Sequence, residues 1–274
     1  MGGRGAVFRF STAFWYTPSP RIRSFSISGP SRERIHWPFS SSGNPFTPLV
    51  KANVVSKILA AARQIKDNDI VFCGTGISMV AAVAAKHIYA PKSIIFFETG
   101  AIDSKLEKLP LAVSDSRVMY KASAFCSLVD SFSFIQNKKT SSNIVGIIGA
   151  AQIDQFGNLN STLTGNYNET TARFPGSGGA CDVASFVNTN IVFMKLEKRK
   201  FVKKLPYITS PGWIDGWNSR VKEGLNDHGP TTVITDMGIF GFESDSKKMM
   251  LKEFYKGITP ETRRGNISFD IDIS

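Results

Sequence analysis

The sequence has few of the residues that build metal centres, disulfide frameworks or membrane spans. It contains three cysteines and three histidines in 274 residues. Cys73, Cys126 and Cys181 stand far apart and none belongs to a CxxC pair, so we expect neither disulfides nor a zinc knuckle, and a reducing compartment fits best. No two histidines lie at ligand spacing, so we expect no metal. No apolar run reaches the roughly 18 residues of a membrane span, and we expect a soluble protein.

Acidic residues are scarce only at the amino end. Residues 1–50 hold six arginines and one acid, whereas residues 51–274 hold 27 basic and 21 acidic residues, within a net charge of +11. The basic residues of the second part gather in Lys195–Lys204 and Lys247–Lys256, without the interleaved aromatics of an RNA-binding face, so we expect no nucleic-acid partner. These runs favour a solvated face or the attraction of an anionic, phosphate-bearing ligand.

Residues 1–45 are rich in Ser, Pro, Gly and Arg and show no sustained helical or strand period. This composition predicts a disordered extension. An organellar transit peptide is also Arg-rich, Ser-rich and acid-poor, and a mis-assigned translation start would give the same composition. Disorder, targeting and a wrong start therefore remain open for this segment.

From residue 48 onward the sequence is regular and predicts one domain, residues 46–274. A helical period runs from Val54 to Ile65, followed by a buried strand at Ile70–Cys73, a turn at 74–76, an Ala-rich helix at Ile77–Tyr89 and a strand at Ser93–Phe97. This order is the βαβ unit of a parallel sheet.

Five further apolar or β-branched runs predict strands: Ile144–Ile148, Ile191–Met194, Thr231–Thr235, Gly238–Phe242 and Lys248–Leu251. The last two of these runs predict an antiparallel hairpin. The fold class is therefore α/β: an open, mostly parallel sheet with helices on both faces and a C-terminal antiparallel hairpin.

Glu98 is the candidate catalytic side chain. It directly follows the apolar strand Ser93–Phe97, so its carboxylate would project from the carboxyl end of a sheet strand, where α/β sheets place their sites. A glutamate in this position is also often the first polar residue of a loop. Position alone leaves both interpretations open.

Two glycine-rich turns are candidate binding segments. Gly74 and Gly76 separate a strand from a helix, where backbone N–H groups could hold an anion, although GxG without a third glycine is weak evidence for a dinucleotide. Glu98 follows Gly76 at about the distance of a ribose-binding acid, so a dehydrogenase also remains open.

The second turn, Arg173–Asp182, is the most glycine-dense stretch. Gly176, Gly178 and Gly179 would let backbone amides approach a reacting oxygen closely enough to form an oxyanion hole. A flexible loop would have the same composition.

Several stretches, in order, resemble the class I CoA transferases, most closely the beta subunits of glutaconate CoA-transferases. They are GTGISMVAAVAAKHIYAP (74–91), FETGAID (97–103), IIGAAQIDQFGNLNST (147–162), RFPGSGGACDVA (173–184), EKRKF (197–201), YITSPGWIDG (207–216), VITDMGIFGF (233–242) and FDIDIS (269–274). The resemblance covers nearly everything from residue 50 to the carboxyl end. It implies the CoA-transferase (NagB/RpiA-like) type of this fold and no longer favours a dehydrogenase.

The resemblance also implies a mechanism. Glu98 in Phe97-Glu98-Thr99-Gly100 falls on the family's nucleophilic glutamate, and Gly176, Gly178 and Gly179 fall on its glycine-rich active-site segment. CoA would move from an acyl-CoA to a carboxylic acid, such as glutaconate or a 3-oxoacid, through a glutamyl-CoA thioester, with no cofactor or metal.

The implied partner is an alpha-type subunit, in a heterotetramer or hetero-octamer. The compartment would be the cytoplasm, or the mitochondrial matrix if residues 1–45 are a transit peptide. Two alternatives remain: a CoA-thioester hydrolase on the same fold, whose chains tend to lack this glutamate, and a non-catalytic binding module.

Overall fold

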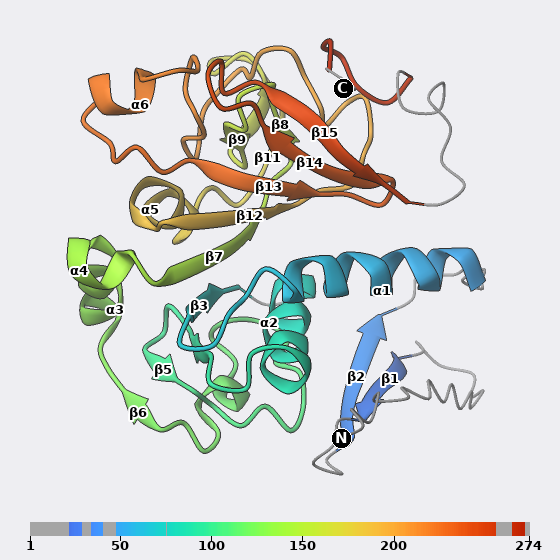
Figure 1. Cartoon of the computed structure of the whole chain (residues 1–274), viewed down its shortest axis with the longest axis vertical. Coiled ribbons are helices and arrows are strands. Elements are labelled where there is room, and N and C mark those ends of the chain that lie inside the picture. Colours follow the sequence, from blue (N-terminus) through green and yellow to red (C-terminus); the bar gives the residue numbers. More distant parts are fainter. Residues whose placement is uncertain (1–21, 29–33, 41–47, 75, 256–264, 272–274) are drawn as a thin grey trace, which may run out of the picture.

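The computed structural model describes residues 22–28, 34–40, 48–74, 76–255 and 265–271 (Figure 1). A nine-stranded sheet forms the centre of this part of the chain, and Figure 1 shows its strands stacked from β15 at the top to β6 at the bottom. In sheet order the strands are β15 (Met249–Phe254), β14 (Gly238–Phe242), β13 (Pro230–Ile234), β12 (Thr189–Phe193), β7 (Ile144–Gly149), β3 (Ile70–Cys73), β4 (Ile94–Phe96), β5 (Ala101–Ile102) and β6 (Ala124–Phe125).

The five central strands, β13, β12, β7, β3 and β4, pair in parallel. The two strands at each end of the sheet are antiparallel. The predicted mostly parallel sheet and the C-terminal hairpin β14–β15 are thus confirmed. All five central strands lie within two residues of their predicted bounds, because each is a short apolar run that the sheet buries on both faces.

The chain order of the parallel strands places a topological switch between β3 and β7. From β3 the chain moves outward to β4, then returns to the other side of β3 as β7 and continues to β12 and β13. In open α/β sheets, ligands bind beyond the carboxyl ends of the strands at such a switch point. The residues that follow β3, β4 and β7 therefore define the edge at which to look for a site.

Helices cover both faces of the sheet. α1 (Pro48–Ala62) and α2 (Ile77–Ile88) share one core with alternate strand residues such as Val71, Ile95 and Ile147. α3 (Leu128–Gln136) and α5 (Ala180–Phe186) lie on the opposite face, where Phe72 and Phe96 pack. The shorter helices are η1 (Ser116–Met119), α4 (Lys138–Ser141) and α6 (Ser219–Lys222). No helix in the described part of the chain is long and apolar enough to cross a membrane.

Three two-stranded sheets complete the fold: β1 (Ile22–Ser28) with β2 (Arg34–Ser40), β8 (Gln152–Ile153) with β9 (Leu159–Asn160), and β10 (Leu163–Gly165) with β11 (Thr170–Arg173). The first pair falls inside the segment for which the sequence predicts no regular structure. The rest of that amino-terminal prediction, residues 1–21, 29–33 and 41–45, lies outside the described residues. β8 and β9 pack through Ile153 and Leu159 on one face of the sheet, over β12 to β15, and so add a layer to this face.

A buried polar network ties this layer together. Asn158 Oδ1 accepts hydrogen bonds from the backbone N–H groups of Gly212 and Ile214, at 2.8 and 3.1 Å, and Asn158 Nδ2 donates to Asp154 Oδ2 at 2.9 Å. Asp154 Oδ1 in turn accepts from the N–H groups of Phe156 and Asn158. The network joins two loops more than 50 residues apart in the sequence, and so fixes the layer above the sheet.

Asp154 is expected to make stability depend on pH. Desolvation by burial, partly offset by hydrogen bonds from Asn158 and Phe156, raises the pKa of Asp154 to about 6. Because the folded state binds this proton more tightly than the unfolded state, the free energy of unfolding should fall as pH rises from about 4 to about 6, by at most about 3 kcal/mol. Asp154→Asn should remove this component in urea titrations, whereas Asp245→Asn, at an exposed acid, should keep it. An unchanged pH dependence in Asp154→Asn would contradict the assignment.

Candidate active site

Glu98 lies at the tip of a tight hairpin that joins β4 to β5. The N–H of Gly100 donates to the carbonyl of Phe97 at 2.9 Å, and the N–H of Phe97 donates to the carbonyl of Ala101 at 3.0 Å. Glu98 and Thr99 are the central residues of this turn. Since β4 runs parallel to β3, the turn holds Glu98 at the carboxyl edge of the sheet, as the sequence predicts.

Gly100 is required by the shape of this hairpin. Its φ of +93° is a backbone conformation that side chains disfavour, and a Cβ atom there would meet the carbonyl oxygen of Cys126 at 1.9 Å. The contact arises because β5 pairs with β6, with Ala101 opposite Phe125. The glycine after Glu98-Thr99 therefore allows β6 to lie against the turn that carries the carboxylate.

The structure brings Glu98 and Gly179 together, although they are 81 residues apart in the sequence. A methyl group at Gly179 would lie 2.7 Å from Glu98 Oε2 and 3.1 Å from the ring of Phe132. Gly179 precedes α5, and Phe132 projects from α3. The Glu98 carboxylate and the Phe132 ring thus both lie beside a backbone without a side chain, and both Glu98 and Phe132 are half-buried.

The glycine-rich turn that reaches this carboxylate is anchored at its start. The N–H of Phe174 donates to the carbonyl of Thr162, and the N–H of Gly176 donates to the carbonyl of Ser161, both at 2.9 Å. Within the described part of the chain, the N–H groups of Gly178 and Gly179 have no such partner. The turn therefore carries two unpaired backbone N–H groups, at Gly178 and Gly179, and Gly179 lies beside the carboxylate of Glu98.

Gly74 and Gly76 lie beside Glu98 along the same edge of the sheet. Phe72 of β3 pairs with Phe96 of β4, and Gly74 and Glu98 each follow two residues later. Gly76 is the N-cap of α2, with a φ of +85°, and apart from its chain neighbours no described residue has an atom within 4 Å of where a Cβ would be at either glycine. The predicted turn thus borders open space, and no direct contact joins it to the carboxylate.

Thr99 adds a polar group to the site. Its hydroxyl oxygen is buried and, within the described residues, has no hydrogen-bond partner. Buried polar atoms in folded proteins are nearly always paired, so an unpaired buried hydroxyl directly after Glu98 is unusual. No group of three or more His, Cys, Asp or Glu residues among the described ones is arranged to hold a metal ion.

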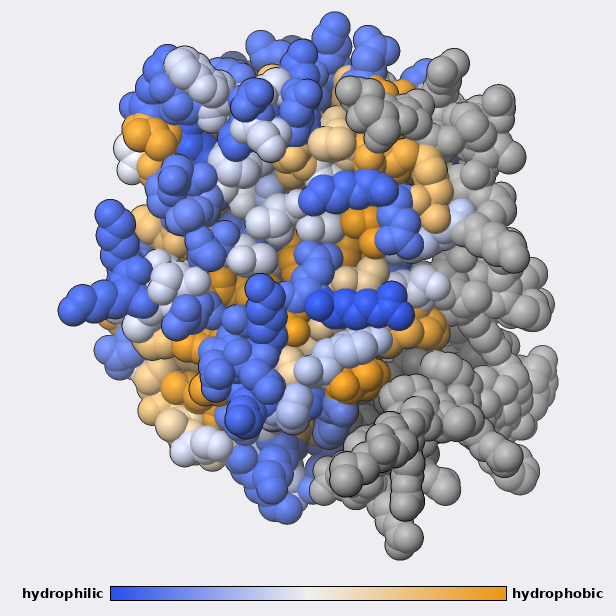
Figure 2. Space-filling model, viewed as in Figure 1, coloured by the Kyte–Doolittle hydropathy of each residue, from blue (hydrophilic) through white to orange (hydrophobic). Residues whose placement is uncertain are grey.

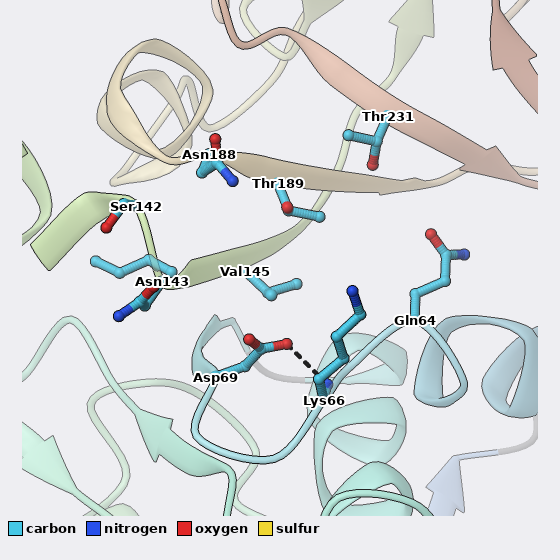
Figure 3. Close-up of a pocket in the computed structure, with 10 residues that line it drawn as sticks. Gln64, Lys66, Asp69, Ser142, Asn143, Val145, Asn188, Thr189 and Thr231 are labelled. Atoms are coloured by element: carbon cyan, nitrogen blue, oxygen red, sulfur yellow. Dashed lines mark hydrogen bonds between the residues drawn. The ribbon is translucent and has the colours of Figure 1, made fainter.

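A polar cleft of about 380 Å³ opens at the opposite edge of the sheet, where β3, β7, β12 and β13 begin (Figure 3). Gln64, Lys66, Asn143 and Thr189 are among its lining residues, and the N–H of Lys66 donates to Asp69 Oδ2 at 2.7 Å. Glu98 follows the carboxyl end of β4. The cleft is therefore a separate feature and does not belong to the candidate active site.

The open, mostly parallel sheet with helices on both faces, and with Glu98 beyond the carboxyl end of β4, defines a protein of the open α/β class. A family model described as Coenzyme A transferase matches residues 55–262, and the chain belongs to the coenzyme A transferase family. Within this family the chain is a CoA-transferase subunit of the B, or beta, type.

Two relatives of known function support this assignment. The chain is 40% identical over 225 residues to the B-type subunit of glutaconate CoA-transferase from Acidaminococcus fermentans, covering 81% of this chain and 84% of the relative. It is 34% identical over 204 residues to the B-type subunit of 3-oxoadipate CoA-transferase from Pseudomonas knackmussii, and this match covers 74% of this chain and 77% of the relative. Both the family and the beta-type role implied by the sequence motifs are thus confirmed.

Solved structures agree on the fold. The crystal structure of the A. fermentans glutaconate CoA-transferase matches with a TM-score of 0.77 at 38% identity, over 81% of this chain and 86% of that chain. The decarboxylase AibA/AibB matches with a TM-score of 0.68 at 20% identity, over the same shares of the two chains. Because the second likeness shows the fold alone, the reaction must be argued from the residues around Glu98.

Phe132 is the site residue that sequence reasoning missed. The one local signal was the start of its helix, where Ser127 and Asp130 form a capping box. A capping box predicts that a helix starts here, but it does not predict that Phe132 of this helix lies near Glu98. Cys126, whose carbonyl borders Gly100, was noted in the sequence only as an unpaired cysteine.

Proposed function

We propose that Glu98 is the nucleophile of this CoA-transferase and that it carries CoA as a glutamyl thioester. The proposal is supported by the position of the Glu98 carboxylate beside Gly179, in a turn with two unpaired backbone N–H groups, and by the ring of Phe132 next to the same glycine. A carboxylate is a weak nucleophile in water, and partial removal from water together with alignment is what makes it effective. Phe132 supplies the apolar wall.

The reaction proceeds in four exchanges at one carboxylate. Glu98 attacks the thioester carbonyl of the donor, forming an acyl-glutamyl anhydride and releasing CoA thiolate. The thiolate attacks the glutamyl carbonyl, forming glutamyl-CoA and releasing the donor acid. The acceptor carboxylate attacks glutamyl-CoA, giving a new anhydride and thiolate, and the thiolate then takes the acceptor acyl group and regenerates Glu98. Every bond formed replaces one broken, and no cofactor enters the sequence of steps.

Each exchange passes through a tetrahedral oxyanion, which needs hydrogen-bond donors. The N–H groups of Gly178 and Gly179 are the donors we assign to this role, because the N–H of Gly176 already donates to Ser161. The open space at Gly74 and Gly76 leaves room for the substrate along the same edge of the sheet.

We also propose an alpha-type partner subunit, as the names of the relatives imply for those proteins. Support comes from the apolar side chains Phe125, Leu128 and Val129, which are 57%, 55% and 72% exposed on the edge strand β6 and at the start of α3. Figure 2 shows one face of the molecule as largely hydrophilic, with separate hydrophobic groups between the polar ones. A partner over β6 and α3 would cover apolar surface next to Phe132 and Glu98.

The acceptor acid, the size of the assembly and the cellular compartment are also proposals. The acceptor acid is glutaconate or a 3-oxoacid, on the precedent of the two named relatives. The assembly is a heterotetramer or hetero-octamer, and the compartment is the cytoplasm or, with a transit peptide, the mitochondrial matrix. Three free cysteines among the described residues fit either reducing compartment.

Coexpression with the alpha-type subunit tests the function. The complex should exchange CoA between an acyl-CoA and a free dicarboxylic or 3-oxo acid, whereas the isolated chain should be inactive and should self-associate through its exposed apolar residues. The measurements are acyl-CoA formation by mass spectrometry and oligomeric state by light scattering. Release of free CoA without an acceptor would instead indicate a hydrolase, and a fully active monomer would contradict the two-subunit proposal.

A further inference from the structure

An aromatic stack lies exposed at the loop that joins β10 to β11. The rings of Tyr167 and Tyr207 have centroids 5.8 Å apart and an interplanar angle of 30°. The Arg173 guanidinium lies over the Tyr167 ring, 5.6 Å from its centroid. Tyr167 and Tyr207 are 59% and 39% exposed, so the two rings form a platform at the surface rather than part of the core. We call these three residues the tyrosine platform.

Two hydrogen bonds hold the two halves of the tyrosine platform in register. Tyr167 belongs to the β10–β11 hairpin, and Tyr207 lies 40 residues further along the chain. Thr209 Oγ1 accepts from the N–H of Ser161 and lies 2.7 Å from Thr162 Oγ1, just before β10. The stack is therefore built on a fixed base, and such an exposed aromatic surface is suited to recognition of a ligand.

The tyrosine platform is connected directly to the catalytic turn. Arg173 ends β11, and the chain reaches Gly179, beside Glu98, six residues later. Six residues span at most about 20 Å, so Arg173 lies within that distance of the Glu98 region. A ligand that binds both places must be long, with its reactive group at one end. A CoA thioester has this form, because its pantetheine arm separates the thioester from the adenine nucleotide.

The charges around the tyrosine platform suit a phosphorylated ligand. Arg173 is exposed, and two exposed lysines, Lys203 and Lys204, precede Tyr207 by a few residues. Glu169, at the tip of the β10–β11 hairpin, is the acid nearest in sequence to Tyr167, and it is also exposed. Among these exposed residues, which are near the platform in sequence, the three cations outnumber the one acid, and such an excess of positive charge attracts phosphates.

From this geometry we infer that the tyrosine platform binds the adenine nucleotide end of the CoA ester. The adenine ring extends the stack on an exposed tyrosine face, and Arg173 with the neighbouring lysines attracts the phosphates. This inference rests on the proposed CoA-transferase function. It adds the position of the nucleotide, while the thioester end of the same ligand lies at Glu98.

Tyr167→Ala in the two-subunit complex tests this inference. Loss of one aromatic stacking partner should raise KM for the acyl-CoA donor about 10-fold, with kcat little changed. The acyl-pantetheine donor of the same acid lacks the nucleotide, and its KM should not change. Tyr167→Phe keeps the ring and should behave as wild type. The matched control is Tyr89→Ala, because Tyr89 is 40% exposed and has the Arg63 guanidinium 6.0 Å from its ring centroid, but it follows α2 at the other edge of the sheet.

A direct binding measurement separates failure of this inference from failure of the proposed function. By calorimetry, the adenosine bisphosphate fragment of CoA should bind the wild-type complex and bind Tyr167→Ala about 10-fold more weakly. This result stands even if the wild-type complex transfers no CoA, an outcome that would overturn the proposed function alone. Unchanged fragment binding in Tyr167→Ala, or an equal rise in KM for both donors, would overturn the inference while leaving the role of Glu98 intact.

Discussion

Replacing Glu98 with glutamine is expected to lower the rate of CoA exchange by at least about 10³-fold, as loss of a covalent nucleophile does in other enzymes. Glutamine keeps the size of the side chain and its place in the hairpin between β4 and β5, but it cannot attack a thioester. Because the side chain is half-buried and neither ion-paired nor hydrogen-bonded in the described structure, fold and partner binding should be unaffected. The measurement is acyl-CoA exchange by the two-subunit complex, with melting temperature and gel filtration as structural readouts.

Glu107→Gln is the matched control for this change. Glu107 carries an exposed carboxylate a few residues after the same hairpin, paired loosely with Lys121 at 3.6 Å, and it takes no part in the proposed chemistry. Its variant should exchange CoA at close to the wild-type rate. If Glu98→Gln, prepared free of deamidation, matched Glu107→Gln in rate, the nucleophile assignment would be wrong.

Gly179→Ala is expected to cause the second large loss, about 10²-fold in kcat, by displacing the carboxylate. The added methyl group would lie 2.7 Å from Glu98 Oε2, so the flexible end of the Glu98 side chain must move. The backbone of Gly179, with φ of −76° and ψ of −2°, accepts alanine without strain. The loss should therefore fall on the chemical step, while the melting temperature stays within a few degrees of wild type.

Gly178→Ala distinguishes this displacement from a general effect of the turn. Among the described residues other than its chain neighbours, none has an atom within 4 Å of a methyl group there, and the cost of the change is the backbone strain of a φ of +49°. Steady-state kinetics should show a much smaller loss of kcat for Gly178→Ala than for Gly179→Ala. Equal losses would mean that the turn, and not the contact with Glu98, limits the reaction.

The elements that the sequence predicted well are those with strong local patterns. Ile70–Cys73 is predicted and observed with the same bounds, and the helix that follows ends one residue earlier than expected. An apolar run between polar residues and an Ala-rich helix stopped before Pro91 leave little choice of structure. The Glu98 position at the end of a parallel strand follows from the same local signals.

Other elements could not be predicted because they depend on contacts far away in the sequence. β5 and β6 are two residues each and exist through pairing with the Glu98 hairpin. The approach of Gly179 and Phe132 to Glu98 is set by packing of α5 and α3 on the sheet, which no local pattern encodes. The strands β1 and β2 lie in the Ser-, Pro-, Gly- and Arg-rich segment for which composition predicted disorder, and among the described strands they pair only with each other.

The most direct test of the account is to trap the covalent intermediate. The two-subunit complex is incubated with an acyl-CoA and then with borohydride, which reduces a thioester to an alcohol. We expect inactivation, release of CoA, and a peptide containing Phe97-Glu98-Thr99 in which the Glu98 side chain has exchanged one carboxyl oxygen for two hydrogens. Glu98→Gln should show no such peptide. An active complex that retains its activity and an unmodified Glu98 peptide after this treatment would contradict a glutamyl-CoA intermediate at this residue.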